Sequence, residues 1–96
     1  MKRIENIEEI RNLKPEQELI RLCCDDVKYY TFLCVHPHNN NYMILINKWT
    51  EKPERFYVQD LVEEFVINYT DDDIMSYRLE YHKNVVQYLE NALSKQ

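Results

Sequence analysis

The chain has 96 residues and contains no glycine. Glycine lets a backbone adopt positive φ or approach a ligand closely, so phosphate-binding loops and dinucleotide-binding turns depend on it. The motifs G-x-G-x-x-G, G-x-x-x-x-G-K-[ST] and G-x-S-x-G are therefore excluded, and so is a standard EF-hand loop. This absence removes most familiar enzyme signatures and favours a protein that acts through its side chains.

Long apolar runs are also missing. The longest run covers residues 43–46, which is far below the roughly 20 residues that span a bilayer. The first ten residues, MKRIENIEEI, alternate charged residues with isoleucine and lack the apolar stretch of a signal peptide. We therefore expect no membrane segment and a cytoplasmic location.

Cysteine is scarce and its pattern does not suit a disulfide framework, because there are three cysteines and two of them are adjacent. The residue types that zinc prefers gather in one region: Cys23, Cys24, Cys34, His36 and His38. In a hairpin with its turn at residues 25 and 26, Cys24 and Cys34 would lie about 25 to 30 Å apart. We expect free thiols, no metal and no cofactor.

Positive charge is in deficit, with 12 basic against 17 acidic residues and a net charge of −5. Hydrophobic residues make up 45% and charged residues 30% of the chain, which is ordinary for a folded protein, so we expect one domain over residues 1–96. The acidity argues against direct binding of nucleic acid or an anionic membrane and favours a basic protein partner.

The first half of the chain predicts one helix followed by an antiparallel meander. Apolar residues at three-residue spacing predict a short helix over residues 4–13, which ends before Pro15. Three strand-like runs follow, at residues 18–24, 27–36 and 42–50, separated by a turn at Asp25–Asp26 and by the polar loop 37–41. Asparagines in this loop can replace glycine at left-handed positions.

The middle run is apolar on both faces. Strand alternation places Val27 and Tyr29 on one face and Tyr30 and Phe32 on the other. A strand covered on both sides is central, so we expect helices against one face of the sheet and a second layer or a partner against the other.

The second half predicts a fourth strand and two helices. Residues 55–58 follow Pro53 and predict a short edge strand. Residues 61–69 have helical spacing, although 65–67 would also suit a strand, and we predict a short helix there. Thr70 and the acids after it predict the start of a long helix over Asp73–Leu93, about 30 Å long, lying across the sheet. The predicted fold is α+β, with a three- or four-stranded antiparallel meander.

Residues 60–73 hold six acids and no lysine or arginine. One interpretation is a solvated helix face followed by acids that favour the positive end of the next helix. The other is a surface that imitates nucleic-acid phosphates and occupies the basic groove of an enzyme. The six acids are candidate partner-binding residues: Asp60, Glu63, Glu64, Asp71, Asp72 and Asp73.

Aromatic residues are frequent, with eight tyrosines, three phenylalanines and one tryptophan. Tyrosine and tryptophan combine a large contact area with a polar tip and are common at interface hot spots. Four of them fall on predicted strands with no helix to cover one face, and we predict that these lie in a homodimer or partner interface: Tyr29, Tyr30, Trp49 and Tyr57.

The function that we expect is non-enzymatic protein binding. The chain would act as a small inhibitor or accessory of a larger basic protein, such as a nucleic-acid-handling enzyme, by partial nucleic-acid mimicry. One alternative is a homodimeric structural protein. Another is a small hydrolase that uses Cys34, His36 or His82. An oxyanion hole is usually built from the amides of a turn, and this chain has no glycine-bearing loop to form one.

Overall fold

The computed structural model describes residues 1–23 and 26–95, so that Cys24 and the predicted turn residue Asp25 lie outside the described residues. The elements in chain order are β1 (Lys2–Arg3), α1 (Ile7–Arg11), β2 (Glu18–Cys23), β3 (Asp26–Val35), β4 (Tyr42–Asn47), β5 (Pro53–Tyr57), α2 (Val58–Leu61), β6 (Phe65–Ile67) and α3 (Asp71–Ser94).

The strands form one antiparallel sheet in the order β1-β6-β2-β3-β4-β5. The prediction of an α+β fold with an antiparallel sheet and a long C-terminal helix is confirmed. The predicted count of three or four strands is too low, since the described residues form six. The additional strands are short, two residues in β1 and three in β6, and so short a run carries little alternating pattern.

The predicted helix over residues 61–69 is wrong. The helical turn α2 comes earlier, and Glu63 then adopts φ 72°, which ends any helix. Val66 pairs with Arg3 of β1 on one side and with Ile20 of β2 on the other. Two ladders therefore hold this segment as a strand, although its local spacing also suits a helix. The predicted edge strand is present as β5, at the end of the sheet.

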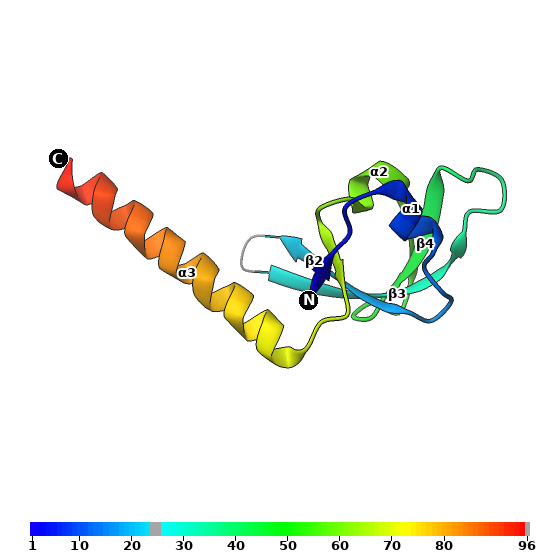
Figure 1. Cartoon of the computed structure of the whole chain (residues 1–96), viewed down its shortest axis with the longest axis horizontal. Coiled ribbons are helices and arrows are strands. Elements are labelled where there is room, and N and C mark those ends of the chain that lie inside the picture. The colour runs from blue at the N-terminus through cyan, green and yellow to red at the C-terminus, as the bar shows by residue number, and fades with distance from the viewer. Residues whose placement is uncertain (24–25, 96) are drawn as a thin grey trace.

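The N-terminal helix is shorter than predicted. It begins after Asn6, whose side chain accepts a hydrogen bond from the Glu9 N–H at 3.0 Å. Ile4 precedes the helix in extended backbone, and its N–H donates to the Phe65 carbonyl at 2.9 Å. The helices α1 and α2 contact each other and close one side of the curved sheet (Figure 1).

The main core lies between this helix pair and the sheet. Tyr30 of β3 is at its centre, 2% exposed, with its ring edge-on to Phe56 at 5.4 Å and tilted against Phe65 at 5.6 Å. Burial raises the pKa of the Tyr30 hydroxyl. The other buried members of this core are Ile4, Ile10, Leu13, Leu19, Phe32, Met43, Leu45, Val58, Leu61 and Phe65.

A second, smaller cluster lies on the opposite face of the sheet. It consists of Ile20, Leu22, Val27, Val66 and Ile74, with Tyr69 and Tyr77 packed against it. The prediction that β3 is a central strand with apolar side chains on both faces is therefore confirmed.

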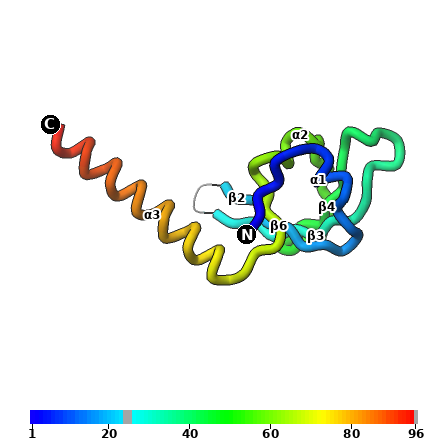
Figure 2. The backbone as a smooth tube through the Cα atoms, viewed as in Figure 1, coloured from blue at the N-terminus to red at the C-terminus, as the bar shows by residue number. Residues whose placement is uncertain are grey.

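The long helix α3 begins and ends close to the predicted bounds, but it does not lie across the sheet. It docks near its start, through the buried Ile74 and through Tyr77, which packs against the same cluster, and most of the helix projects away from the body (Figures 1 and 2). The physical reason is that α1 and α2 already fill one face of the sheet, while the other face offers only the small cluster around Ile74.

Among the described residues, four take positive φ: Glu16 (70°), Glu51 (60°), Glu63 (72°) and Asn68 (55°). Each such position costs about 1–2 kcal/mol relative to right-handed backbone. Asn39, Asn40 and Asn41 are not among the positive-φ residues. Asn39 instead uses its side chain, which accepts a hydrogen bond from the Asn41 N–H at 3.0 Å.

We predict that Glu51→Gly raises the free energy of unfolding by up to about 1 kcal/mol, because glycine removes the steric cost of positive φ. The Glu51 N–H bond to the Asn47 carbonyl, 2.8 Å, is kept in the variant. Urea denaturation measures the change. Glu8→Gly, at an exposed position inside α1, is the matched control and should lower stability by about 1 kcal/mol. A Glu51→Gly protein no more stable than the parent would contradict this account.

Candidate protein-binding site

An exposed aromatic surface lies where the outer face of β3 meets the turn after β4 and the start of α3. We call Tyr29, Trp49 and Tyr69 the aromatic patch. Tyr29 and Trp49 line an open groove of about 610 Å³ together with Asp26, Val27, Lys28, Asn47 and Lys48. This volume is within the range of ligand-binding clefts, which run from roughly 300 to 1,000 Å³.

Strand alternation places Tyr29 in the patch. Its neighbour in the strand, Tyr30, points to the opposite face and is buried in the main core. Tyr29 itself is 37% exposed, opposite Ile20 of β2. The Tyr29 side chain therefore lies next to Ile20 of the outer cluster and is partly exposed to solvent.

A tight turn presents Trp49. The Asn47 side-chain oxygen accepts hydrogen bonds from the N–H groups of Trp49 (2.8 Å) and Thr50 (3.3 Å). The Lys48 N–H donates to the Tyr29 carbonyl at 3.0 Å, which joins the turn to β3. The backbone of the turn is thus well bonded, yet the Trp49 side chain is 93% exposed. Trp49 was predicted to lie in a strand, whereas β4 ends at Asn47.

Tyr69 completes the patch from the segment that leads into α3. Its ring lies edge-on to Tyr29, with the centroids 6.4 Å apart. Burial, together with the negative charges of Glu18 and Asp71, raises the pKa of Tyr69 to about 12. The Tyr69 hydroxyl is therefore neutral at physiological pH and can both donate and accept a hydrogen bond.

The charges around the patch are of both signs. Lys48 is paired with Glu18 at 2.6 Å, and Asp26 and Lys28 bring opposite charges to the same groove. Asp71 and Asp72 follow Tyr69 closely in sequence at the exposed start of α3. The groove is close to neutral, and its border beside Tyr69 is acidic.

The six predicted acids do not form one surface. Asp60 lies in α2 and Glu63 just after it, whereas Asp71, Asp72 and Asp73 open α3 at the other end of β6 (Figure 1). Glu64 forms an ion pair with Arg21, whose guanidinium lies 2.8 Å from the Glu64 carboxylate. Only the acids of α3 lie beside the aromatic patch.

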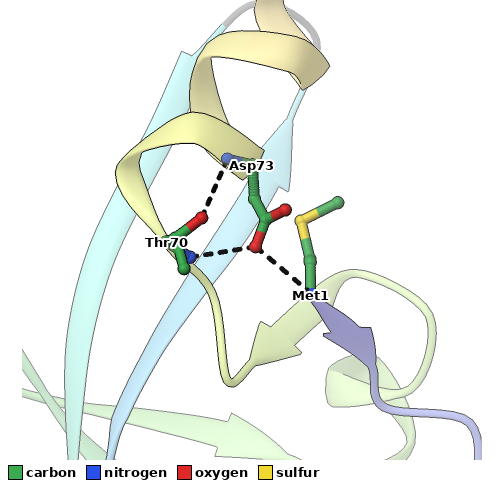
Figure 3. Close-up of polar contacts among 3 residues, drawn as sticks. All are labelled: Met1, Thr70 and Asp73. Atoms are coloured by element: carbon green, nitrogen blue, oxygen red, sulfur yellow. Dashed lines mark hydrogen bonds and ion pairs between the residues drawn. The ribbon is translucent and has the colours of Figure 1, made fainter.

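Asp73 has a structural role at the start of α3. Its carboxylate accepts a hydrogen bond from the Thr70 N–H (2.9 Å), while its own N–H donates to the Thr70 hydroxyl (3.2 Å), which forms a capping box (Figure 3). The Met1 amino group lies 3.3 Å from the same carboxylate. These contacts, first the Thr70 hydrogen bond and then the amino group, lower the pKa of the Asp73 carboxyl.

The four aromatic residues predicted to contact a partner also lie in different environments. Tyr29 and Trp49 come together in the patch, whereas Tyr30 is buried and therefore takes no part in the surface. Tyr57 lies on the edge strand β5, where its ring packs edge-on against Tyr42 at 5.6 Å.

Sequence reasoning missed Tyr69 as a site residue. Its position one residue before Thr70, a helix N-cap, was the available signal that it would sit at a junction.

The residues considered for metal binding or catalysis are dispersed. Cys23 and Cys34 are exposed and far apart, because Cys23 of β2 lies beside the start of β3 and Cys34 lies near the end of β3. Among the described residues, no three cysteine, histidine or acidic side chains come together as a metal site would require. His36 uses its Nδ1 atom to accept a hydrogen bond from the His38 N–H at 3.1 Å. His82 lies on α3, at the other end of the molecule from the loop that follows β3 (Figure 1).

Comparisons of this chain with protein-family models, with curated proteins and with solved structures found no match. None of the helices in the described part of the chain combines the length and the apolar character needed to cross a bilayer.

We predict that Asp73→Ala loosens the start of α3 and lowers the melting temperature by a few degrees at neutral pH. Because the folded-state pKa of Asp73 lies below the ordinary value of 3.8, its contribution is complete above that pH and is lost as pH falls through the lowered pKa. Thermal melts of both proteins between neutral pH and about pH 2 should therefore converge at the acidic end.

Asp72→Ala is the matched control, since it removes an acid from the same helical turn but leaves the capping box in place. It should shift the melting temperature less than Asp73→Ala. Equal shifts for the two variants at neutral pH would show that general charge, and not the cap, sets the stability of this junction.

Proposed function

We propose that this protein is a small non-enzymatic protein-binding module, which acts as an inhibitor or accessory of a larger protein and engages it through the aromatic patch. The observation that carries the proposal is Trp49, a tryptophan with 93% of its side chain in solvent on a hydrogen-bonded turn beside a groove. Large exposed aromatics on a fixed backbone are typical of interface hot spots.

Burial of the Trp49 side chain by a partner would be energetically favourable. An exposed tryptophan can bury roughly 200 Å² at an interface, which corresponds to about 5 kcal/mol before the costs of association are subtracted. Tyr29 lines the same groove as Trp49, and its ring packs against Tyr69, so the two tyrosines would lose little rotational freedom when a partner covers them.

The partner that best suits this surface carries basic side chains. The chain has a net charge of −5, and Asp71 and Asp72 border the patch with no recorded ion-pair partner among the described residues. Arginine or lysine from a partner could contact these carboxylates and also stack on the face of Trp49. A nucleic-acid-handling enzyme offers such a surface. Mimicry of phosphates would be limited to the α3 acids, since Asp60 and Glu63 lie at the other end of β6.

The proposal is tested by affinity capture from the native host with the parent protein and with Trp49→Ala, followed by calorimetry with the purified partner. We expect the variant to lose at least about tenfold in affinity, or 1.4 kcal/mol. Tyr57→Ala is the control, because Tyr57 is an exposed aromatic at the end of β5 away from the Trp49 turn, and this variant should bind like the parent. A partner that binds Trp49→Ala and parent equally would refute the role of the patch.

The charge of the interface is tested separately by Asp71→Asn combined with Asp72→Asn. If the partner is basic, the affinity should fall in this variant, and the affinity of the parent should fall with rising salt. Binding that does not respond to salt would exclude a basic partner while leaving the aromatic contact intact.

A further inference from the structure

Most of α3 projects from the body of the molecule (Figures 1 and 2). Ile74 is its only buried residue, and residues 86–95 are all exposed. The molecule measures 55 × 25 × 24 Å, and its long dimension reflects the projecting helix (Figures 1 and 2). An isolated helix of this kind is marginal in water, because helices in proteins gain most of their stability from packing an apolar face.

The exposed part of α3 carries a regular apolar stripe, which we call the α3 seam. Its members alternate steps of four and three residues: Met75, Leu79, His82, Val86, Leu89 and Leu93. The five apolar members are 53 to 68% exposed, and His82 is exposed as well. Alternate steps of four and three form a heptad pattern, in which each side chain inserts between four side chains of a facing helix. The pattern therefore specifies another helix as the occupant.

The seam is separate from the face that α3 turns toward its own body. The buried or half-buried residues of the helix are Ile74, Tyr77, Tyr81 and Val85, together with Asp73 at the cap. At about 100° per residue, the stripe of Ile74, Tyr77, Tyr81 and Val85 is centred roughly 110° around the helix from the seam. A second helix can therefore cover the seam without displacing any contact within the chain.

We infer that the α3 seam binds the α3 seam of a second copy of this chain, with the two helices antiparallel. A register centred on Asn84 brings the seams into full overlap. The layers are then Met75 with Leu93, Leu79 with Leu89, and His82 with Val86, each formed twice by symmetry.

Charge decides between the two orientations at the helix ends. In the antiparallel pair, the acidic start of one helix, at Asp71–Asp73, lies beside Lys95 at the end of the other. The helix dipoles also run in opposite directions, which is favourable. In a parallel pair, the two acidic starts would lie side by side, with Asp72 facing its own copy at a seam position.

The flanking residues agree with the antiparallel orientation. A parallel pair would place Arg78 beside Lys83 of the second copy on both flanks, which is repulsive, and would face His82 with its own copy. In the antiparallel pair, Val85 meets its own copy along one flank and adds apolar contact. Lys83 approaches its own copy on the other flank, where Glu90 of the second copy is within reach of each lysine.

The expected interface is small. The seam can bury roughly 500 Å² on each copy, or about 1,000 Å² in total, which is at the lower limit for specific association. We therefore expect a dimer that forms in the micromolar range. This pairing does not rest on the proposed function, because the aromatic patch and the seam are different surfaces.

The pairing is tested by sedimentation velocity over a concentration series up to about 500 µM, well above a micromolar dissociation constant. The mean mass of the parent should rise from that of the 11.9 kDa chain toward twice that value. Leu79→Glu and, independently, Leu89→Glu should weaken the association at least about tenfold. Both replace an exposed residue by a good helix former, and circular dichroism verifies that the sheet is retained.

Tyr88→Glu is the matched control, because Tyr88 is exposed on α3 but lies outside the seam. It should dimerise like the parent. A parent that stays monomeric throughout the series, or a dimer that survives Leu79→Glu and Leu89→Glu, would overturn the inference. In neither case would the result change the expected effect of Trp49→Ala on partner binding.

The orientation is tested by disulfide trapping in a background with the three native cysteines replaced by serine. A mixture of Met75→Cys and Leu93→Cys proteins should form a mixed disulfide under mild oxidation, because these positions share a layer in the antiparallel pair. Each variant alone should cross-link poorly. Efficient cross-linking of Met75→Cys to itself would show a parallel pair and would overturn the antiparallel assignment.

Discussion

The alternation of side chains along β3 is the constraint on which the rest of the structure depends. This strand is the longest in the sheet and is paired on both sides. One set of its residues, including Tyr30 and Phe32, builds the core under α1 and α2, and the other set includes Val27 of the outer cluster and Tyr29 of the aromatic patch. A shift of one residue in its register would exchange the core with the aromatic patch.

Local sequence patterns predicted the elements that carry a long, regular signal. The apolar faces of β3, the edge position of β5 and the bounds of α3 followed from alternation, from Pro53 and from the cap at Thr70. The strand β6 did not, because Phe65–Ile67 suits helix and strand equally and its state is decided by β1 and β2. The position of α3 was not predicted either. An apolar stripe indicates that a helix buries one face, but it does not indicate which element packs against that face.

The candidate site was predictable only in part for similar reasons. Alternation separates Tyr29 from Tyr30, but it does not say which side α1 and α2 will fill, and so both tyrosines were expected at the surface. The six acids fall within fourteen residues of sequence, yet β6 runs between them and separates α2 from the start of α3. The turn after β4 contains no glycine and uses Asn47 and the positive-φ residue Glu51 instead, and this turn presents Trp49.

Because α3 is attached near its start, through Ile74 and Tyr77, the rest of the helix projects as a long arm. The helix is about 36 Å long at 1.5 Å per residue, and it is anchored at the junction formed by Thr70, Asp73 and Ile74. A rotation of only 10° at this junction would sweep the far end of the helix through about 6 Å, while the sheet and its core stay unchanged. Small changes beside Tyr69, where the aromatic patch meets the same junction, would therefore be amplified into large displacements at the end of α3.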